Sequence, residues 1–317
     1  MDFNHVTVMK RRAVDALSVK PDGVYADCTA GGGGHTAEIL SRLNENGTVV
    51  AIDQDPDAVA ALRERFAGEE RVSVVQGNFS SIRQILGNLG LGRADGILAD
   101  LGVSSHQLDT AERGFSFHAE APLDMRMSKS GLSAYDVVNG YTEAQLTRVI
   151  FEYGEDHFAK SIARRICEER AKEPIADTLR LAEIIKTAIP ARARREGGHP
   201  ARRTFQAIRI ETNRELELLP GAVREMFAML SVGGVLAIIT FHSLEDRIVK
   251  NEFRAFASGC TCPSYFPVCT CGKTPSGRVR EKGAPPDPDE LAENPRCRSA
   301  RLRSIEKIRD ETSVSGG

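Results

Sequence analysis

The sequence predicts an α/β protein whose mostly parallel sheet is covered by helices on both faces and interrupted by an inserted helical domain. Three observations predict it. Between residues 24 and 101, short apolar segments alternate with amphipathic helical segments, which is typical of strands buried on both faces of a parallel sheet. Residues 104–212 contain helical patterns and no strand of comparable strength. A further apolar strand follows at 235–241.

Four strands and three helices make up the first part of the predicted sheet domain. The strand segments are VYADCT (24–29), TVVAID (48–53), VSVVQ (72–76) and GILADL (96–101). The helical segments, at 35–43, 56–66 and 80–89, space their apolar residues at intervals of three and four. Pro56 suits a first helical turn, because a backbone N–H there would have no partner within the helix.

The helical insertion is too long to be a loop. Its helical segments are EAQLTRVIFEYG (143–154), HFAKSIARRICEERA (157–171) and DTLRLAEIIKTAI (177–189). We therefore expect a helical domain at 104–212, inserted into a domain formed by residues 1–103 and 213–317.

The predicted sheet resumes after the insertion. A helix is expected at 216–234, where a Gly-Gly pair stops it, and the buried strand VLAIITF follows at 235–241. Residues 243–257 are again helical, and the alternation of SARLRSIEKI (299–308) is typical of an edge strand.

Composition limits the classes of protein that need to be considered. The chain has 317 residues, 41% of them hydrophobic and 27% charged, and it contains no apolar run long enough to span a membrane. The first residues lack the pattern of a secretory signal, so we expect a cytoplasmic protein. A net charge of −2 argues against a surface that is basic all over, but a local basic patch for nucleic acid is compatible with it.

The most informative local motif is the run GGGGH at 31–35, between the first strand and the first helix. A phosphate-binding P-loop needs Lys followed by Ser or Thr after its last glycine, and His35-Thr36 stands there instead. The dinucleotide fingerprint is incomplete, because its third glycine would fall at Thr36. Asp53, at the end of the second strand, is the acid expected to accept hydrogen bonds from both hydroxyls of a ribose.

Two more residues follow strand ends of the predicted sheet. Phe79, in QGNFS, is placed where a ring could border an adenine, although packing in the core explains it equally well. Asp100 ends the fourth strand, at the edge where open α/β sheets bind their ligands. A carboxylate there can accept a hydrogen bond from an amino group of a cofactor or from an amine presented for reaction.

Five segments together carry a resemblance to a known family. They are GGGGH, AIDQDP, ILADLGVSSHQLDTAERGFSFHAEAPLDMRM, RRTFQAIRIETNREL and ITFHSLEDRIVK, in this order. With them the chain resembles the MraW/RsmH family of bacterial rRNA methyltransferases, from residue 5 to about residue 308.

The resemblance implies a fold, an activity and a set of site residues. The fold is a class I S-adenosylmethionine-dependent methyltransferase (Rossmann-like) sheet with an inserted all-helical substrate domain. The implied reaction methylates the exocyclic amine of a cytidine in 16S rRNA of the small ribosomal subunit. In this reaction we expect Asp100 to be the catalytic residue. The implied cofactor contacts are Gly33, Gly34, His35, Asp53, Phe79, Asp100 and Gln107. We expect no metal among these residues.

The chemistry of an exocyclic amine constrains the mechanism. The amine is a weak nucleophile because its lone pair is delocalised into the ring, so alignment with the methyl group is the main requirement. Asp100 and the backbone carbonyls of Leu101 and Gly102 are placed to accept the protons of the amine. The turn contains no cysteine, which disfavours methylation at carbon five of the base through a thiolate nucleophile.

Several segments are candidates for contact with RNA. Residues 190–214 contain seven arginines and two glutamates, and arginine both binds phosphates and stacks on bases. A solvated charged surface is the alternative interpretation of this segment. Candidates to line the pocket of the target base are Phe115, Phe117, Met125, Arg126 and Met127, although ordinary packing explains each of them at least as well. His242 follows the fifth strand, so it also lies at the edge of the sheet where ligands bind.

Some features of the sequence leave alternatives open. Two C-x-C pairs, Cys260 with Cys262 and Cys269 with Cys271, could hold zinc, but their spacing favours separate thiols. An NAD-dependent dehydrogenase and a non-catalytic RNA-binding module are the alternative functions. A homodimer is compatible with the sequence, which does not require one.

Overall fold

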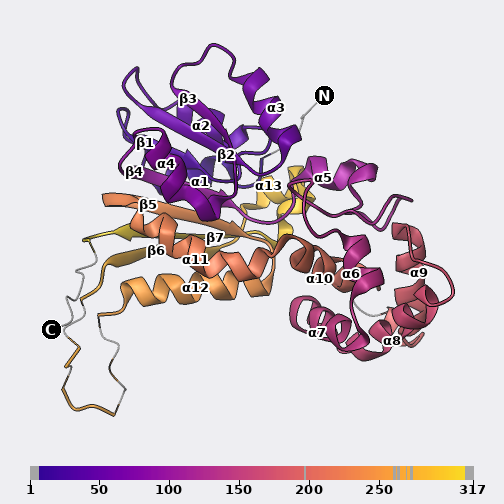
Figure 1. Cartoon of the computed structure of the whole chain (residues 1–317). Coiled ribbons are helices and arrows are strands. Elements are labelled where there is room, and N and C mark those ends of the chain that lie inside the picture. Colours follow the sequence, from indigo (N-terminus) through magenta and orange to yellow (C-terminus); the bar gives the residue numbers. More distant parts are fainter. Residues whose placement is uncertain are drawn as a thin grey trace. The chain divides into compact units, whose positions relative to one another are not determined.

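The computed structural model describes residues 7–195, 198–259, 262, 265–268, 270–271 and 274–310. The chain divides into two compact units (Figure 1): Met1–Gly102 together with Glu217–Gly317, and Val103–Leu216. The sequence pattern placed the helical insertion at 104–212. Each unit has a hydrophobic core of its own.

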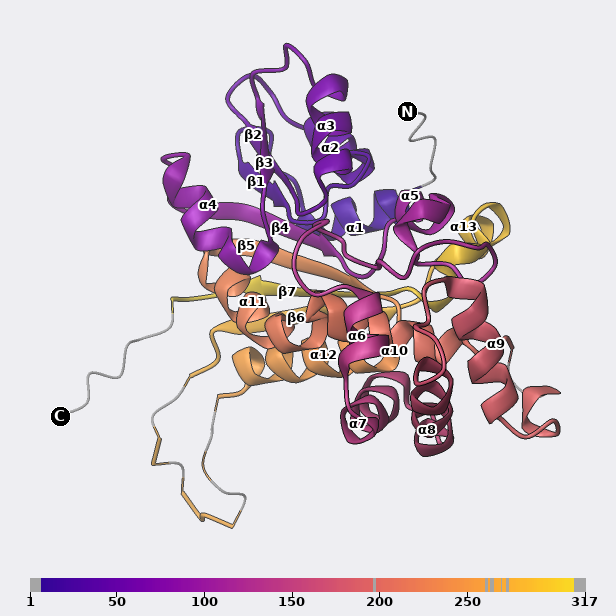
Figure 2. The same cartoon turned by 45° about the vertical axis from the view of Figure 1, so that its right-hand side comes forward.

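The first unit contains, within its described residues, a seven-stranded sheet (Figures 1 and 2). Its strands are β1 Val24–Asp27, β2 Thr48–Asp53, β3 Val72–Gln76, β4 Ala94–Asp100, β5 Leu230–Thr240, β6 Gly277–Ala284 and β7 Arg301–Lys307. Their order is β3-β2-β1-β4-β5-β7-β6. Strands β1 to β5 pair in parallel, whereas β7 is antiparallel to both β5 and β6.

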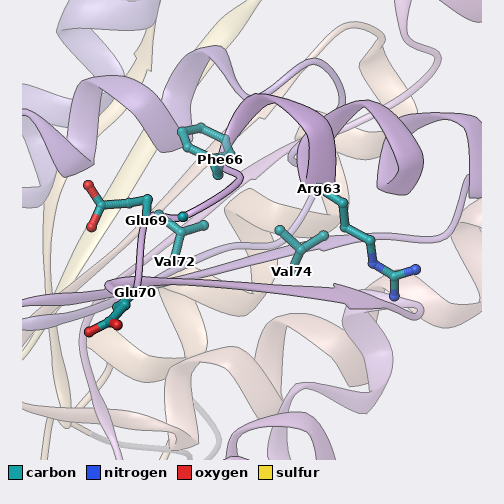
Figure 3. A pocket seen from close by; sticks show the side chains of 7 residues that line it. Arg63, Phe66, Glu69, Glu70, Val72 and Val74 are labelled. Carbon is teal, nitrogen blue, oxygen red and sulfur yellow. The ribbon is translucent and has the colours of Figure 1, made fainter.

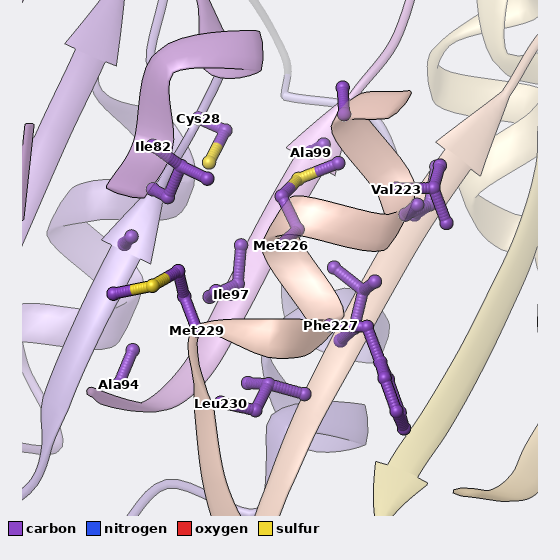
Figure 4. Packing of buried hydrophobic residues seen from close by; sticks show 14 of the residues in the cluster. Cys28, Ile82, Ala94, Ile97, Ala99, Val223, Met226, Phe227, Met229 and Leu230 are labelled. Carbon is purple, nitrogen blue, oxygen red and sulfur yellow. The ribbon is translucent and has the colours of Figure 1, made fainter. Parts of the chain in front are cut away.

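Helices cover the two faces of this sheet. They are α1 Lys10–Leu17, α2 Gly34–Leu40, α3 Pro56–Arg65, α4 Ile82–Asn88, α11 Glu215–Ala228, α12 Ser243–Ala257 and α13 Pro288–Glu293. Along β4, Ile97 and Ala99 join the cluster that contains Met226 and Phe227 of α11 (Figure 4), while Leu98 joins the opposite cluster with α1. The strand is apolar on both faces because both faces are buried.

Strand β5 begins earlier than the sequence pattern indicates. Helix α11 ends at Ala228, and the strand runs from Leu230, so the expectation of a helix as far as residue 234 is wrong. The pairing steps from Ala94 with Leu230 to Gly96 with Val235, which makes the Gly-Gly pair an irregularity within the strand. Gly233 adopts a φ of 87°, which favours glycine at such a bulge.

The edge of the sheet also differs from the expectation. Strand β7 lies between β5 and β6, so it is not an edge strand, and β6 is the edge that the sequence pattern did not predict. The residues of β6 are mostly half-buried or exposed and often charged, so they lack the signature of a strand. Arg303 is buried in β7, where Asp246 of α12 accepts hydrogen bonds from its guanidinium at 2.7 and 2.8 Å.

The second unit is helical. Its helices are α5 Ser105–Asp109, α6 Ala134–Gly140, α7 Glu143–Gly154, α8 Ala159–Arg170, α9 Thr178–Ala188 and α10 Arg202–Asn213. In its described residues the only β pairing is an isolated bridge between Pro122 and Asp177. Helix α7 begins where the sequence pattern predicts, because Thr142 and Gln145 form a capping box there.

Among the described residues, no helix is long and apolar enough to cross a membrane.

Candidate active site

The strand order creates a switch point between β1 and β4. From β1 the chain builds β2 and β3 on one side, and it then returns to place β4 on the other side. Open α/β sheets bind ligands at the carboxyl ends of the strands on either side of such a point. Asp27 ends β1, Asp53 ends β2 and Asp100 ends β4, so three acids reach this edge.

Asp53, at the end of β2, forms a hydrogen bond to the glycine-rich loop. Its Oδ2 accepts a hydrogen bond from the backbone N–H of Gly31 at 2.8 Å, and its Oδ1 accepts one from Asp55 N–H at 2.8 Å. Each carboxylate oxygen can accept another hydrogen bond, so capacity for two ribose hydroxyls is retained. Burial raises the pKa of Asp53 to about 6.

Neighbouring side chains of the protein leave no room for a Cβ at Gly33 or Gly34. Gly33 has a φ of 78°, and a Cβ there would lie 2.8 Å from the ring of Phe66 and 2.9 Å from Leu62. A Cβ on Gly34 would overlap the side chain of Thr7. The need for glycine at these two positions therefore does not require a ligand, and their contact with a cofactor stays a prediction.

Gly31 has different surroundings. Its φ is 50°, and the nearest atom to an added Cβ is the carbonyl oxygen of Thr29, at 3.9 Å. A Cβ at this position would meet no close neighbour, although the positive φ disfavours most side chains. Gly31 is therefore the position at which a side chain would test for a bound ligand without a clash inside the protein.

The ring of His35 is committed to a contact within the protein. It is buried, and its Nε2–H donates a hydrogen bond to the carbonyl oxygen of Val8 at 3.0 Å. Burial lowers the pKa of His35 to about 4, so the ring is neutral at pH 7. A cofactor contact by this residue stays a prediction.

Asp27 was missed as a site residue in the sequence. It is fully buried, and its Oδ2 accepts a hydrogen bond from Thr36 Oγ1 at 2.7 Å. The same loop reaches β4, because Thr29 Oγ1 accepts a hydrogen bond from Asp100 N–H at 2.6 Å. Asp27 could have been found by the signal that identified Asp53 and Asp100, an acid at the carboxyl end of an apolar strand.

Asp27 should make the stability of the protein depend on pH. Burial raises its pKa to about 6, so between about pH 4 and pH 6 the folded state retains a proton that the unfolded state has lost. The free energy of unfolding should therefore fall as the pH rises through this window, by up to about 3 kcal/mol for this group.

Urea unfolding at a series of pH values measures this effect. Asp27→Asn should reduce the slope between pH 4 and pH 6, with a remainder due to Asp53, whose pKa is also raised to about 6, while the substitution of exposed Asp22 by Asn leaves the slope unchanged. Equal slopes in wild type and Asp27→Asn would contradict the prediction.

Asp100 has the least satisfied carboxyl group at this edge. Within the described part of the chain, its buried Oδ1 has no hydrogen-bond partner. Burial raises its pKa well above the usual range, and the negative charges of Asp27, Glu245 and Glu290 raise it further. A buried acceptor without a partner is costly in a protein, and a donor group on a ligand would satisfy it.

His242 follows β5 and caps the next helix. Its Nδ1 accepts a hydrogen bond from Glu245 N–H at 3.5 Å, and its Nε2 lies 3.1 Å from Glu245 Oε1. Glu245 Oε2 also accepts from Phe241 N–H at 2.9 Å. These contacts give His242 a structural role at the start of α12.

The remaining predicted cofactor contacts lie in different units. Phe79 begins a short 3₁₀ helix, Phe79–Ser81, after β3, and it packs half-buried against the core. Gln107 belongs to the helical unit, where its Oε1 accepts a hydrogen bond from Ser104 N–H at 3.0 Å in the capping box of α5. A cofactor contact stays a prediction for both residues.

Most candidates for a base pocket pack inside the helical unit. Phe115, Met125 and Met127 are buried in its core. Arg126 Nη2 donates a hydrogen bond to Asp124 Oδ2 at 2.6 Å. These side chains are explained by packing and ion pairing, while Phe117 is only half-buried.

A hollow of about 370 Å³ lies on the first unit beside the amino-terminal part of β3 (Figure 3). Its lining residues are Arg63, Phe66, Gly68, Glu69, Glu70, Val72 and Val74. The ring of Phe66 is also the neighbour that an added Cβ at Gly33 would meet. The hollow is distinct from the three acids, which lie at the opposite ends of their strands.

The described residues contain no group of three His, Cys, Asp or Glu side chains that could hold a metal ion. Of the four thiols considered for zinc, Cys260 and Cys269 lie outside the described residues. Both interpretations of these cysteines, a zinc site and separate thiols, therefore stay predictions.

The fold and the site define a class of protein. A parallel sheet with its switch point between β1 and β4, an antiparallel β7 inserted next to β5, a glycine-rich loop after β1 and acids at the strand ends are the features of class I S-adenosylmethionine-dependent methyltransferases. The predicted fold class is thus confirmed.

The chain belongs to the MraW methylase family, whose model matches residues 2–308. It is 50% identical over 311 residues to the ribosomal RNA small subunit methyltransferase H of Clostridioides difficile (strain 630), covering 97% of this chain and 100% of that protein. A protein of the same name from Clostridium botulinum (strain Kyoto / Type A2) is 50% identical over 310 residues, with 97% and 100% covered.

Among solved structures, an rRNA methylase from Streptococcus thermophilus has a TM-score of 0.42 and 10% identity, covering 96% of this chain and 99% of that chain.

Proposed function

We propose that this protein transfers a methyl group from S-adenosylmethionine to the exocyclic amine of a cytidine in 16S rRNA of the small ribosomal subunit. Its relatives at 50% identity, named as rRNA small subunit methyltransferases, support the RNA substrate. The observation that carries the chemistry is the buried Oδ1 of Asp100, which has no partner in the described structure.

The strand-end residues fit the proposed cofactor. When bound, S-adenosylmethionine supplies a methyl group activated by a positively charged sulfonium. Asp53 offers two carboxylate oxygens for the ribose hydroxyls, and the space beside Gly31 is open. The negative charge of ionised Asp53 also complements a cation. Asp53 must be ionised to accept both hydrogen bonds, so cofactor affinity should fall as the pH drops below about 6.

Asp100 is proposed to act on the amine of the substrate. Its raised pKa makes its carboxylate a better proton acceptor than an ordinary aspartate, which suits a group that takes a proton as the amine is methylated. Gly102, with a φ of 90°, turns the backbone directly after this strand. The carbonyls of Leu101 and Gly102 are the additional acceptors in this proposal.

Two buried cysteines of the first unit are unsuited to methylation at carbon five of the base, the alternative to methylation of the amine. Methylation at carbon five needs a thiolate that adds to the ring. Cys28 follows β1 and is buried, and burial raises the pKa of its thiol. Cys297 is also buried, with its pKa raised for the same reason. Both thiols are protonated at neutral pH and unsuited to nucleophilic attack.

The segment after the glycine-rich loop does not support the alternative function, an NAD-dependent dehydrogenase. The position where a dinucleotide site would have its third glycine is Thr36, whose hydroxyl donates to Asp27. That hydrogen bond takes the place of the close packing between helix and strand that the glycine would allow.

We propose the helical unit, Val103–Leu216, as the part that recognises RNA. Three of the arginines at 190–214, Arg192, Arg202 and Arg203, are exposed, as contact with phosphates requires. The proposal includes a cytoplasmic location. Analytical ultracentrifugation of the full chain would decide between a monomer and a homodimer.

Two loop variants should separate folding from cofactor binding. Asparagine tolerates a positive φ, so the free energy of unfolding of Gly31→Asn should lie within about 0.5 kcal/mol of the wild-type value. Its side chain should obstruct the cofactor and weaken the binding of S-adenosylmethionine at least about tenfold. Gly33→Ala should lower the free energy of unfolding by about 2 kcal/mol, because its Cβ meets Phe66 and Leu62. Chemical denaturation and calorimetry measure the two effects, and unchanged affinity in Gly31→Asn would remove the cofactor from this loop.

The proposed function is tested with small ribosomal subunits from a strain that lacks this protein. The full chain should transfer a labelled methyl group from S-adenosylmethionine to their 16S rRNA, and subunits from the parent strain should accept little. Calorimetry should show binding of S-adenosylmethionine and none of NAD. Binding of NAD alone would favour the dehydrogenase, and cofactor-independent RNA binding without transfer would favour an RNA-binding module.

A further inference from the structure

Three aromatic side chains form a cluster on the helical unit, Phe117, His118 and His199, here called the ring cluster. The rings of Phe117 and His199 are stacked, with their centroids 4.4 Å apart and their planes at 12°. The ring of His118 is tilted by 51° against Phe117, at 4.4 Å. The cluster joins two segments that are about 80 residues apart in the sequence.

The ring cluster extends from the core of the unit to its surface. Phe205 is buried in the core and meets Phe117 edge to face, with centroids 5.4 Å apart. Phe117 is half-buried, whereas His118 and His199 are exposed. The series of rings therefore ends in an imidazole on the surface, and a series that served only the core would not need this last ring.

The outermost ring is held in place. His199 Nδ1 accepts a hydrogen bond from Ala201 N–H at 3.2 Å, and the carbonyl oxygen of His199 accepts one from Arg202 N–H at 3.0 Å. Both contacts lie at the start of α10. A ring that is already oriented loses little conformational freedom when another ring stacks on it.

Charges near the ring cluster are predominantly positive. Partial burial lowers the pKa of His199, and the nearby His118 and Lys186 lower it further, so its ring is neutral at pH 7. Exposed arginines occur on the same segment at Arg192, Arg202 and Arg203. The acidic neighbours in sequence are Glu183, which pairs with Lys186 at 2.9 Å, Glu120, and Glu196, which lies outside the described residues. A flat neutral ring among cations matches a nucleobase and its phosphates.

We propose that the ring cluster is a stacking surface for an unpaired base of the RNA substrate, with the neighbouring arginines contacting its phosphates. Proteins bind single-stranded RNA by stacking bases on aromatic and histidine side chains within a basic surface. The inference rests on the proposed function, because it assigns the grip on RNA to particular side chains. It makes His199 an RNA-binding residue with no part in methyl transfer itself.

Binding of a fluorescein-labelled single-stranded oligoribonucleotide to the full chain tests the proposal, followed by fluorescence anisotropy. His199→Ala should weaken binding about tenfold, the effect expected for loss of one stacked base. His199→Tyr should restore it to within about twofold of wild type, because it keeps a flat ring. His157→Ala removes another exposed histidine of the same unit and should leave binding unchanged. The same RNA annealed to its complement should bind more weakly to wild type and show no difference between the variants.

Two outcomes would overturn the proposal. One is equal RNA affinity of His199→Ala and His157→Ala. The other is a loss of RNA affinity in His199→Tyr that is as large as the loss in His199→Ala. That result would show that the imidazole nitrogens matter and the ring face does not. Calorimetry with S-adenosylmethionine separates this proposal from the function: wild type that binds RNA and cofactor but transfers no methyl group contradicts the function and leaves the stacking surface standing.

Discussion

Asp100→Asn should lower the rate of methyl transfer at least about 100-fold, the range in which proton acceptance by a positioned side chain contributes to catalysis. Asparagine keeps the shape of the side chain but cannot take a proton from the amine. The variant should fold at least as stably as wild type at pH 7, because it removes a buried carboxyl group whose Oδ1 has no partner in the described structure. Single-turnover transfer of a labelled methyl group and chemical denaturation measure the two effects.

Asp95→Asn is the matched control for this experiment. Asp95 lies on the same strand five residues earlier, where it pairs with Lys20 at 2.8 Å and accepts a hydrogen bond from Val24 N–H at 3.1 Å. The Asp95→Asn variant should have a lower free energy of unfolding than wild type and the same rate of methyl transfer. An Asp100→Asn enzyme that transfers methyl groups at the rate of Asp95→Asn would remove Asp100 from catalysis.

Asp53→Ala should weaken the binding of S-adenosylmethionine at least about 100-fold. Two hydrogen bonds from ribose hydroxyls to a charged acceptor contribute about 1.5 to 3 kcal/mol each. Asp53→Asn retains one acceptor oxygen, so its loss should be smaller, about tenfold. Calorimetry at pH 7.5 gives these affinities, and in wild type alone the affinity should decline as the pH is lowered through about 6, where Asp53 takes up a proton.

Glu64→Ala serves as the control, because it removes one negative charge from the exposed face of α3. Its affinity for the cofactor should match wild type. If Asp53→Ala bound as tightly as Glu64→Ala, Asp53 would serve only to hold Gly31 and Asp55, and the ribose contact would have to be sought elsewhere.

Much of the fold was predictable because the central strands are buried on both faces. Strands β2 and β3 and helices α7 and α12 have the bounds that the apolar pattern predicts. Strand β6 was not predictable in this way, because an exposed edge strand with charged residues has no apolar signature. The Gly-Gly pair at 233–234 was misread as a helix stop, since the sequence does not distinguish that role from a bulge in a strand.

The candidate site was partly predictable for a related reason. Acids at strand ends are visible in the sequence, so Asp53 and Asp100 were found, and Asp27 could have been found in the same way. The packing around Gly33 and the bond from His35 to Val8 were not predictable, because they depend on segments far from the loop in the sequence. Their roles toward a cofactor, like that of Gln107, stay predictions.

The identity of the methylated nucleotide tests the central claim most directly. After reaction of unmethylated small subunits with the full chain and labelled S-adenosylmethionine, the 16S rRNA is digested to nucleosides and the label is identified by chromatography and mass spectrometry. The account predicts a single labelled nucleoside, a cytidine methylated on its exocyclic amine. Label in 5-methylcytidine, or in a nucleoside other than cytidine, would contradict it.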